Sequence, residues 1–329
     1  MNLNPVGWAS RVLTPLLRII RTSPNATVPV VVISEPVTSE TSAIVNSDIA
    51  LVAKGTGATL AQVPDGTIVG GNKRGTYATD WQKLRQSASQ VAGTYATIGG
   101  GIYNTASGIV ATIAGGQGGT ASNDYAFIGG GQNNNASGSR TTIAGGVNNS
   151  ASNGWATVAG GNNNNASGSY SFIGGGDSNT ASSNYSFIGG GTGNTAQSNQ
   201  NITVCGGYYN LASGERSVIG GGSVNTATTF GSTIGGGESN TISTNTYATI
   251  SGGRSNLASG QYAFVGGGYN NTANGTSSSV LGGQFGTTRS IGNYQVICGG
   301  VAIASVAGVT QTALLLLARE TTDATATVL

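Results

Sequence analysis

Carboxylates are the residues of this chain that come closest to the chemistry of a catalyst. A glycosidase that depolymerises a polysaccharide needs two carboxyl groups about 5–10 Å apart. Within residues 93–300 the acidic side chains are Asp124, Asp177, Glu215 and Glu238. The repeat described below places Asp177 about 19 Å from Glu238 and Asp124 farther still from Glu215. We therefore expect no catalytic pair within one chain, whereas a pair formed across two subunits remains an alternative.

Histidine is absent, which excludes imidazole bases, Ser-His-Asp triads and His-ligated metals. The two cysteines, Cys205 and Cys298, lie about 29 Å apart in the predicted repeat, beyond the reach of a disulfide. Both follow an interior position, so we expect buried free thiols. The run 116–121 matches a dinucleotide-binding glycine fingerprint but opens no helix. The sequence thus predicts no enzyme, no cofactor and no metal site.

The composition also limits the partners. Of 329 residues, 57 are Gly and only 7% are charged, with a net charge of +2. This charge gives no strong attraction to nucleic acid or to an anionic membrane surface. The chain has no apolar run long enough to span a membrane as a helix, so none is predicted.

A strict repeat positions these side chains. An Ile or Val, here called the anchor, precedes a small pair such as Gly-Gly at intervals of 15 residues ten times, 16 twice and 17 once. The anchors are Ile98, Ile113, Ile128, Ile143, Val158, Ile173, Ile188, Val204, Ile219, Ile234, Ile250, Val265, Val280 and Ile297. A unit this short and rich in Gly favours one turn of a parallel β-solenoid, giving a rod about 65 Å long. Ile68 is a candidate for an earlier, degenerate turn.

Two interior positions and one turn position follow from the repeat. Six residues after each anchor stands Asn or Gly, as at Asn104 and Gly119, and these residues tolerate positive φ. We therefore expect a left-handed turn at this position. Two residues later comes a small residue such as Ala106. Because side chains alternate along a strand, the anchor and the Ala two before it should share the inward face.

Aromatic residues recur three before the anchor and are predicted to point outward. A slender roll cannot bury them by itself, and a long apolar stripe commonly marks an interface. We expect these residues to line a homotrimer seam or to stack on a ligand, with partly exposed aromatics that shield the backbone as the alternative. The candidates are Tyr95, Tyr125, Trp155, Tyr170, Tyr185, Tyr247 and Tyr262.

Two runs carry a family resemblance. Residues 104–116 (NTASGIVATIAGG) and 164–176 (NNASGSYSFIGGG) resemble the head repeats of trimeric autotransporter adhesins. The resemblance implies a left-handed parallel β-roll that trimerises. This chain departs from those repeats by one extra residue per turn, in the glycine segment.

Residues 1–92 contain little glycine and are predicted to attach the rod to another protein. Residues 7–22 can form a short basic amphipathic helix, and the candidate docking residues are Trp8, Arg11, Arg18 and Arg21. The arginines within the apolar run do not fit a signal peptide, so secretion is not expected. Two strands are predicted at 28–33 and 48–53.

The segments 54–67 and 70–82, which lead into the repeats, resemble the junctions of tail-fibre and other virion proteins of tailed phages, cyanophages among them. We therefore expect a non-enzymatic, homotrimeric tail fibre or tailspike in the virion, which attaches to a host surface glycan or protein. Its regions are an attachment region at 1–92, a shaft at 93–300 and a C-terminal cap at 301–329. The alternatives are a capsid or vertex decoration fibre, a bacterial trimeric surface adhesin that would lack its membrane anchor here, and a spike depolymerase with an inter-subunit site.

Overall fold

The chain forms two compact units, Met1–Leu51 and Val52–Leu329. The computed structural model describes residues 18–20, 30–32, 59–60, 66–67, 72–82, 84–90, 92–198, 200–290, 294–299, 301–303 and 314–316. In the first unit β1 (Arg18–Ile20) pairs antiparallel with β2 (Val30–Val32). The helix predicted at 7–22 is therefore wrong at 18–20, where two β-branched isoleucines pair with a valine run that suits a strand. The strand predicted at 28–33 is confirmed over 30–32, and the one at 48–53 lies outside the described residues.

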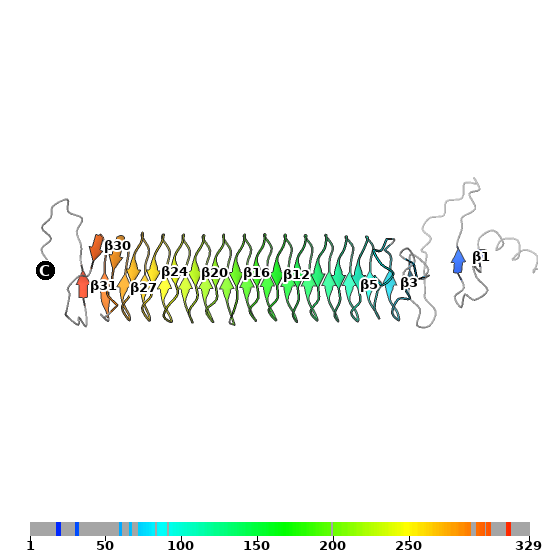
Figure 1. Ribbon diagram of the computed structural model, residues 1–329, viewed down its shortest axis with the longest axis horizontal. Helices are drawn as coiled ribbons and strands as arrows, with labels where there is room; N and C mark the ends of the chain where they lie inside the picture. Colours follow the sequence, from blue (N-terminus) through cyan, green and yellow to red (C-terminus); the bar gives the residue numbers. More distant parts are fainter. Residues whose placement is uncertain are drawn as a thin grey trace, which may run out of the picture. The chain divides into compact units, whose positions relative to one another are not determined.

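The second unit is a parallel β-solenoid, in which successive turns stack along one axis (Figure 1). One strand of each turn belongs to the sheet that carries the anchors, here called the anchor sheet. Its strands are β3 (Thr59–Leu60), β4 (Thr79–Asp80), β5 (Thr97–Ile98), β7 (Thr112–Ile113), β9 (Phe127–Ile128), β11 (Thr142–Ile143), β13 (Thr157–Val158), β15 (Phe172–Ile173), β17 (Phe187–Ile188), β19 (Thr203–Val204), β21 (Val218–Ile219), β23 (Thr233–Ile234), β25 (Thr249–Ile250), β27 (Phe264–Val265), β29 (Ser279–Val280), β31 (Gln295–Ile297) and β33 (Leu314–Leu316).

The other strand of each turn belongs to a second sheet, here called the alanine sheet. Its strands are β6 (Thr105–Ala106), β8 (Thr120–Ala121), β10 (Asn135–Ala136), β12 (Ser150–Ala151), β14 (Asn165–Ala166), β16 (Thr180–Ala181), β18 (Thr195–Ala196), β20 (Leu211–Ala212), β22 (Thr226–Ala227), β24 (Thr241–Ile242), β26 (Leu257–Ala258), β28 (Thr272–Ala273), β30 (Gln284–Thr287) and β32 (Val301–Ile303). The described residues contain no helix. The predicted all-β parallel solenoid is therefore confirmed, with about 14 turns that give a strand to both sheets.

The two sheets enclose a narrow interior filled by the residues that the repeat assigned to it. The anchors Ile98, Ile173 and Ile234 are fully buried, as is Ala96 two residues before an anchor. The anchors form a continuous column because the strands pair in register. Ile143, for example, pairs with Val158 in the next turn. Each anchor thus removes its side chain from water, which stabilises the fold by about 1.5–3 kcal/mol.

A second interior column consists of asparagines. The side chain of Asn164 is fully buried, and its Nδ2 donates to the carbonyls of Gly160, 3.0 Å away in the same turn, and Gly176, 2.9 Å away in the next turn. Its Oδ1 accepts the backbone N–H of Asn179 at 3.0 Å. The same bonds recur from turn to turn, so the column satisfies backbone groups that would otherwise be buried without partners.

This geometry corrects the role expected for the asparagines. The left-handed backbone occurs one residue earlier than predicted, as at Asn163 with φ of 53° and Asn148 with φ of 54°. The buried Asn164 itself is absent from the left-handed positions. The position favours Asn because its amide can donate twice and also accept, whereas tolerance of positive φ is not needed there.

The glycines that follow each anchor are required for a different reason. At Gly146 φ is +91°, and a Cβ would lie 2.2 Å from the carbonyl oxygen of Gly161 in the next turn. A side chain would therefore be strained and would also push the turns apart.

Completing the asparagine column should stabilise the solenoid. At Gly119 the column is interrupted, although the N–H of Gly119 still bonds to Asn104 Oδ1 at 2.9 Å. The backbone of Gly119 is not left-handed, and a Cβ would meet Asn104 Oδ1 at 3.2 Å, which requires only a small adjustment. We expect Gly119→Asn to raise the free energy of unfolding by about 1–2 kcal/mol through new hydrogen bonds and a less flexible unfolded chain.

Thermal or urea unfolding would measure this gain. Gly146→Asn is the matched control and should be strongly destabilising, since its backbone is left-handed and its Cβ has no room. A loss of stability in Gly119→Asn would contradict the structural role that we assign to the asparagine column.

Parallel pairing continues on both sides of the region predicted as the shaft. Before it, β4 pairs with β5 so that Asp80 lies opposite Ile98, 18 residues later. After it, β32 pairs with β30 and β33 with β31, which extends both sheets into the predicted C-terminal cap. Ile68, the predicted early anchor, lies outside the described residues.

Candidate functional site

The predicted aromatic residues lie on a turn that joins the alanine sheet to the anchor sheet. Each of them has a left-handed backbone, with φ of 57° at Tyr170 and 56° at Tyr185. Such a conformation is uncommon for a residue other than Gly, Asn or Asp. It turns the side chain out of the interior, and Tyr170 and Tyr185 are 46% and 53% exposed. We call this row of residues the ladder corner.

Several of these rings stack on one another from turn to turn. Ring centroids are 4.8 Å apart for Trp155 and Tyr170 and 5.0 Å apart for Tyr170 and Tyr185, with interplanar angles of 6° and 5°. The guanidinium of Arg140 lies between Tyr125 and Trp155, 5.1 and 5.2 Å from the two ring centroids. The spacing matches the distance between turns, so register alone brings the rings together.

The remaining candidates form shorter stacks. Tyr247 stacks on Tyr262 with centroids 5.5 Å apart, and Tyr95 stacks on Tyr77 at 5.0 Å. The stack that includes Tyr77 was not anticipated, although Thr76-Tyr77-Ala78-Thr79 repeats Thr94-Tyr95-Ala96-Thr97.

Stacking determines which ring surface a partner can reach. Both faces of Tyr170 are covered by its neighbours, so its edge and hydroxyl point outward and it has no face for a ligand. Tyr185 stacks on Tyr170, and the next residue of the ladder corner on its other side is Asn201. Tyr185 is therefore an end of the long stack, and no described ring covers its second face.

The stacking should offset the strain of the left-handed backbone. Val110 occupies the same turn position with φ of 60°, where a β-branched residue is especially unfavourable. We expect Val110→Asn to stabilise the chain by about 1 kcal/mol because Asn tolerates this backbone. Tyr170→Asn should instead destabilise it by about 1–2 kcal/mol, since two ring stacks are lost.

Urea unfolding of the two variants measures the change in the free energy of unfolding for each, which we expect to be positive for Val110→Asn and negative for Tyr170→Asn. Destabilisation by both changes would show that side-chain packing, rather than backbone strain, dominates at Val110. Stabilisation by both would show that the stacks contribute little.

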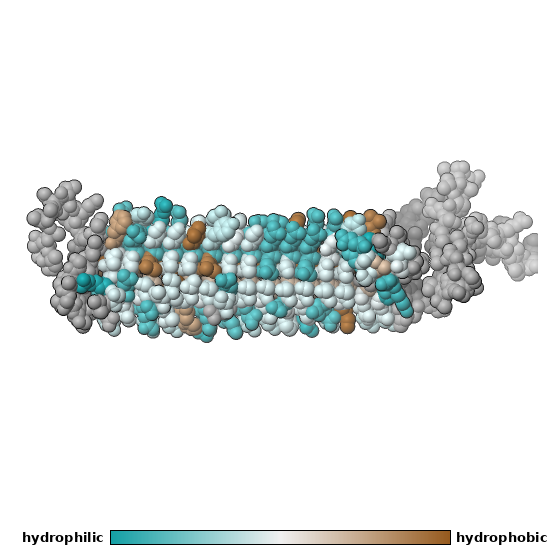
Figure 2. Space-filling view, viewed as in Figure 1, coloured by the Kyte–Doolittle hydropathy of each residue, from teal (hydrophilic) through white to brown (hydrophobic). Residues whose placement is uncertain are grey.

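A second set of aromatic residues lies on the outer face of the anchor sheet, one residue before the anchors. Phe172 and Phe187 stack with centroids 5.4 Å apart, and Phe187 is 41% exposed. We call Phe127, Phe172, Phe187 and Phe264 the phenylalanine stripe. Unlike tyrosine, these side chains have no polar group for water. On the face shown in Figure 2, the surface is largely hydrophilic or neutral and the hydrophobic residues are scattered.

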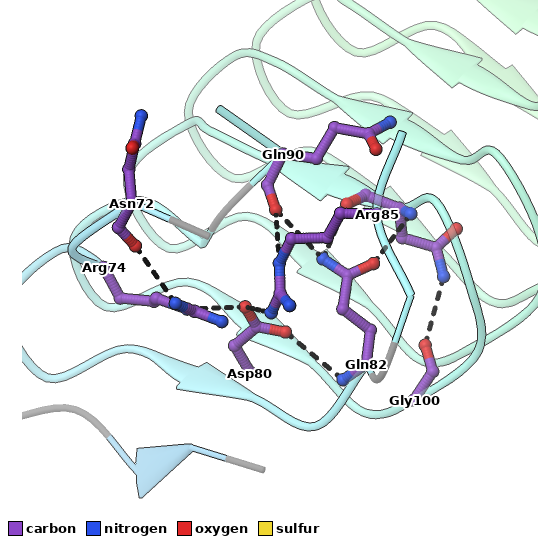
Figure 3. Close-up of polar contacts among 8 residues, drawn as sticks. Asn72, Arg74, Asp80, Gln82, Arg85, Gln90 and Gly100 are labelled. Atoms are coloured by element: carbon purple, nitrogen blue, oxygen red, sulfur yellow. Dashed lines mark hydrogen bonds and ion pairs between the residues drawn. The ribbon is translucent and has the colours of Figure 1, made fainter. Parts of the chain in front are cut away.

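Charged residues are buried at the first described turns of the solenoid (Figure 3). The Asp80 carboxylate, which occupies an anchor position, accepts from Arg74 Nε at 2.8 Å and from Arg85 at 2.6 Å. All three side chains are fully buried. Two guanidinium groups around one carboxylate supply the pairing that a buried charge requires.

Gln82 joins this cluster to the asparagine column. Its Nε2 donates to the carbonyl of Asn104 and its Oε1 accepts the N–H of Asn104, both at 2.8 Å. Gln82 therefore replaces the asparagine that a preceding turn would supply. Sequence reasoning missed this cluster, although Gly75–Thr79 repeats Gly93–Thr97 with Asp80 in the place of Ile98. The substitution of an anchor by an acid was the available signal.

The four acids of the shaft are distributed as the repeat indicated. Asp177 and Glu238 lie on one line of parallel bridges, separated by Thr192, Tyr208 and Ser223. The Asn162 amide and the Ser178 hydroxyl donate to Asp177 and hold the pKa of its carboxyl below the ordinary value. Glu238 forms an exposed ion pair with Arg254 at 3.5 Å.

The cysteines differ from the prediction. Cys205 is exposed and Cys298 is partly exposed, rather than buried in an interior slot. The reason is the alternation along the strand: the anchor points inward, so the residue after it points outward.

The predicted docking residues Trp8, Arg11 and Arg21 lie outside the described residues, and Arg18 begins β1.

No protein-family model matches the chain, and no curated protein is significantly similar to it. Within the described residues, no helix has the length and apolar character needed to cross a membrane.

Proposed function

We propose that this chain is a non-enzymatic fibre or spike protein of a tailed-phage virion that mediates attachment to the host. The single observation that supports this most is the uninterrupted solenoid of about 14 turns. Its interior is occupied by aliphatic side chains and the asparagine column, so we expect its middle to be a stiff spacer. The resemblance of residues 54–82 to phage fibre junctions supplies the virion assignment.

The assembled form in this proposal is a homotrimer of left-handed rolls with fifteen-residue turns. Two features of the single chain favour an interface along the phenylalanine stripe. Phe187 remains substantially exposed and has no polar atom, so burial against another chain would be favourable. The rings of the ladder corner already cover one another, and their tyrosine hydroxyls can face water. We therefore place the subunit seam at the stripe and leave the ladder corner outward.

Deletion of the first compact unit tests the attachment role. Removing residues 1–51 retains Arg74, Asp80 and Arg85, whereas removing 1–92 would also delete this buried cluster. We expect the shortened chain to be a soluble trimer by sedimentation that no longer enters particles. A monomer at micromolar concentration would contradict the trimer, and normal incorporation would contradict attachment through the N-terminal unit.

A further inference from the structure

A cavity lies among the turn residues that precede the ladder corner, where the turns change length. Six residues, 197–202, separate β18 from β19, whereas five residues, 182–186, separate β16 from β17 in the turn before. The longer connection includes Ser198, which has a left-handed φ of 81°. The cavity at this place has a volume of about 390 Å³. We call it the polar notch, and it is lined by Ser182, Ser183, Asn184, Ser198, Gln200 and Glu215.

The lining is suited to a ligand rich in hydroxyl groups. All six residues are polar, and Asn184, Gln200 and Glu215 have planar groups that can bond two neighbouring hydroxyls at once. The volume falls within the range of about 300–1,000 Å³ that is common for ligand sites. The single carboxylate, Glu215, has Arg216 beside it at 3.7 Å, so the local charge is nearly balanced. A neutral ligand therefore fits better than an acidic one.

One hydroxyl in the notch is buried without a partner. Ser183 is 4% exposed, and its Oγ makes no hydrogen bond in the part of the chain that the structure describes. A buried polar atom of this kind costs about 1–3 kcal/mol if nothing bonds to it. Thr229, which holds the same place in its own turn, has a buried hydroxyl without a partner as well, so this feature belongs to the turn and the case for a ligand rests on the lining of the notch.

An aromatic residue follows one of the lining residues in the chain. Tyr185 follows Asn184 in the chain and ends the stack that begins at Tyr125. The next positions of the ladder corner are Asn201 and Arg216, which bond through their backbone N–H groups to Asn184 and Gln200. Tyr185 is thus the chain neighbour of a lining residue, and no further ring stacks on its second face within the described residues. The carbon-hydrogen face of a sugar ring packs well on such a surface.

We propose that the polar notch binds a pyranose unit of a neutral glycan, with Tyr185 beneath the ring and Asn184, Gln200 and Glu215 bonded to its hydroxyls. This inference rests on the proposed attachment function and names the ligand class for it. A trimer would present three such notches, and simultaneous contacts would compensate for a weak individual affinity.

A glycan array probed with the labelled full-length chain tests the notch. The array should carry neutral, sulfated and sialylated glycans, and we expect binding to the neutral group. Gln200→Ala and Tyr185→Ala should each weaken that binding roughly threefold to tenfold through the loss of one contact. Tyr95→Ala is the matched control, because it removes an exposed ladder ring in another stack and should leave binding unchanged.

Three results would overturn the inference: no neutral glycan bound, binding to acidic glycans alone, or neutral binding that is unaffected by both notch variants. Measuring whether the same chain enters virions distinguishes failure of the glycan-binding inference from failure of the proposed attachment function. If the chain enters virions and the virions attach to cells even when the notch is mutated, the attachment function stands and the notch inference fails. If the notch binds a neutral glycan but the chain is absent from virions, the notch inference stands and the virion assignment fails.

Discussion

Ile173→Asp should lower the free energy of unfolding by about 3–5 kcal/mol and the melting temperature by roughly 6–20 °C. Ile173 is fully buried between the anchors Val158 and Ile188, and the column around it contains no basic group to pair with a carboxylate. The charge would have to lie in a dry interior or force the turn open. Because each turn contacts mainly its neighbours, the damage should be greatest in the adjacent turns.

Thr157→Asp is the control for this change. Thr157 lies next to the anchor Val158 but on the outward side of the sheet, so the same charge should alter stability by less than about 1 kcal/mol. Calorimetry would compare the two variants. Equal melting temperatures for Ile173→Asp and the parent chain would show that the inward assignment of the anchors is wrong.

Asp80→Asn should have an effect of similar size at the N-terminal end of the rod. Arg74 and Arg85 both bond to one oxygen of Asp80, and all three side chains are excluded from water. Removing the carboxylate leaves two guanidinium charges without their counter-charge, a change that typically costs about 3–5 kcal/mol. Hydrogen exchange should rise first in residues 72–104, because Gln82 connects this cluster to the asparagine column.

A hydrophobic replacement distinguishes charge pairing from packing. The triple variant Asp80→Ile, Arg74→Met and Arg85→Met makes this turn resemble the others, and stability should return to the parent value or exceed it by about 1–4 kcal/mol. Asp124→Asn controls for loss of an acid at a site that is not buried. Unchanged exchange in Asp80→Asn would contradict a stabilising role for the cluster.

The period of the sequence was sufficient to predict the solenoid and its inward face. A repeat of anchors restricts each strand to one register, and alternation then places Ile98 and Ala96 inside. The same reasoning indicated the outward aromatics, of which Tyr170 and Tyr185 are examples. It did not indicate that these rings stack on one another, since stacking depends on the left-handed turn that aligns them.

The sequence-based predictions were wrong where one residue type can serve two different structural roles. Asn164 was interpreted through backbone tolerance, but its position depends on the hydrogen bonds of its side chain. Cys205 was assigned to the interior because small residues share its position, whereas the pleat directs it outward. Residues 18–20 fit a helical pattern in isolation, and pairing with Val30–Val32 makes them a strand.

The buried ions and the notch were beyond the reach of the repeat pattern because both are departures from it. Asp80 is unfavourable at an anchor position unless two arginines from flanking residues converge on it, which only the fold reveals. The notch requires a turn with one extra residue beside an interrupted stack.

Cryo-electron microscopy of the intact phage particle, with the full-length chain located by labelling, tests the central proposal most directly. We expect a three-fold rod of stacked turns that projects from the tail. Density on the head would contradict host attachment and support a decoration fibre. A particle without this chain would contradict the virion assignment altogether.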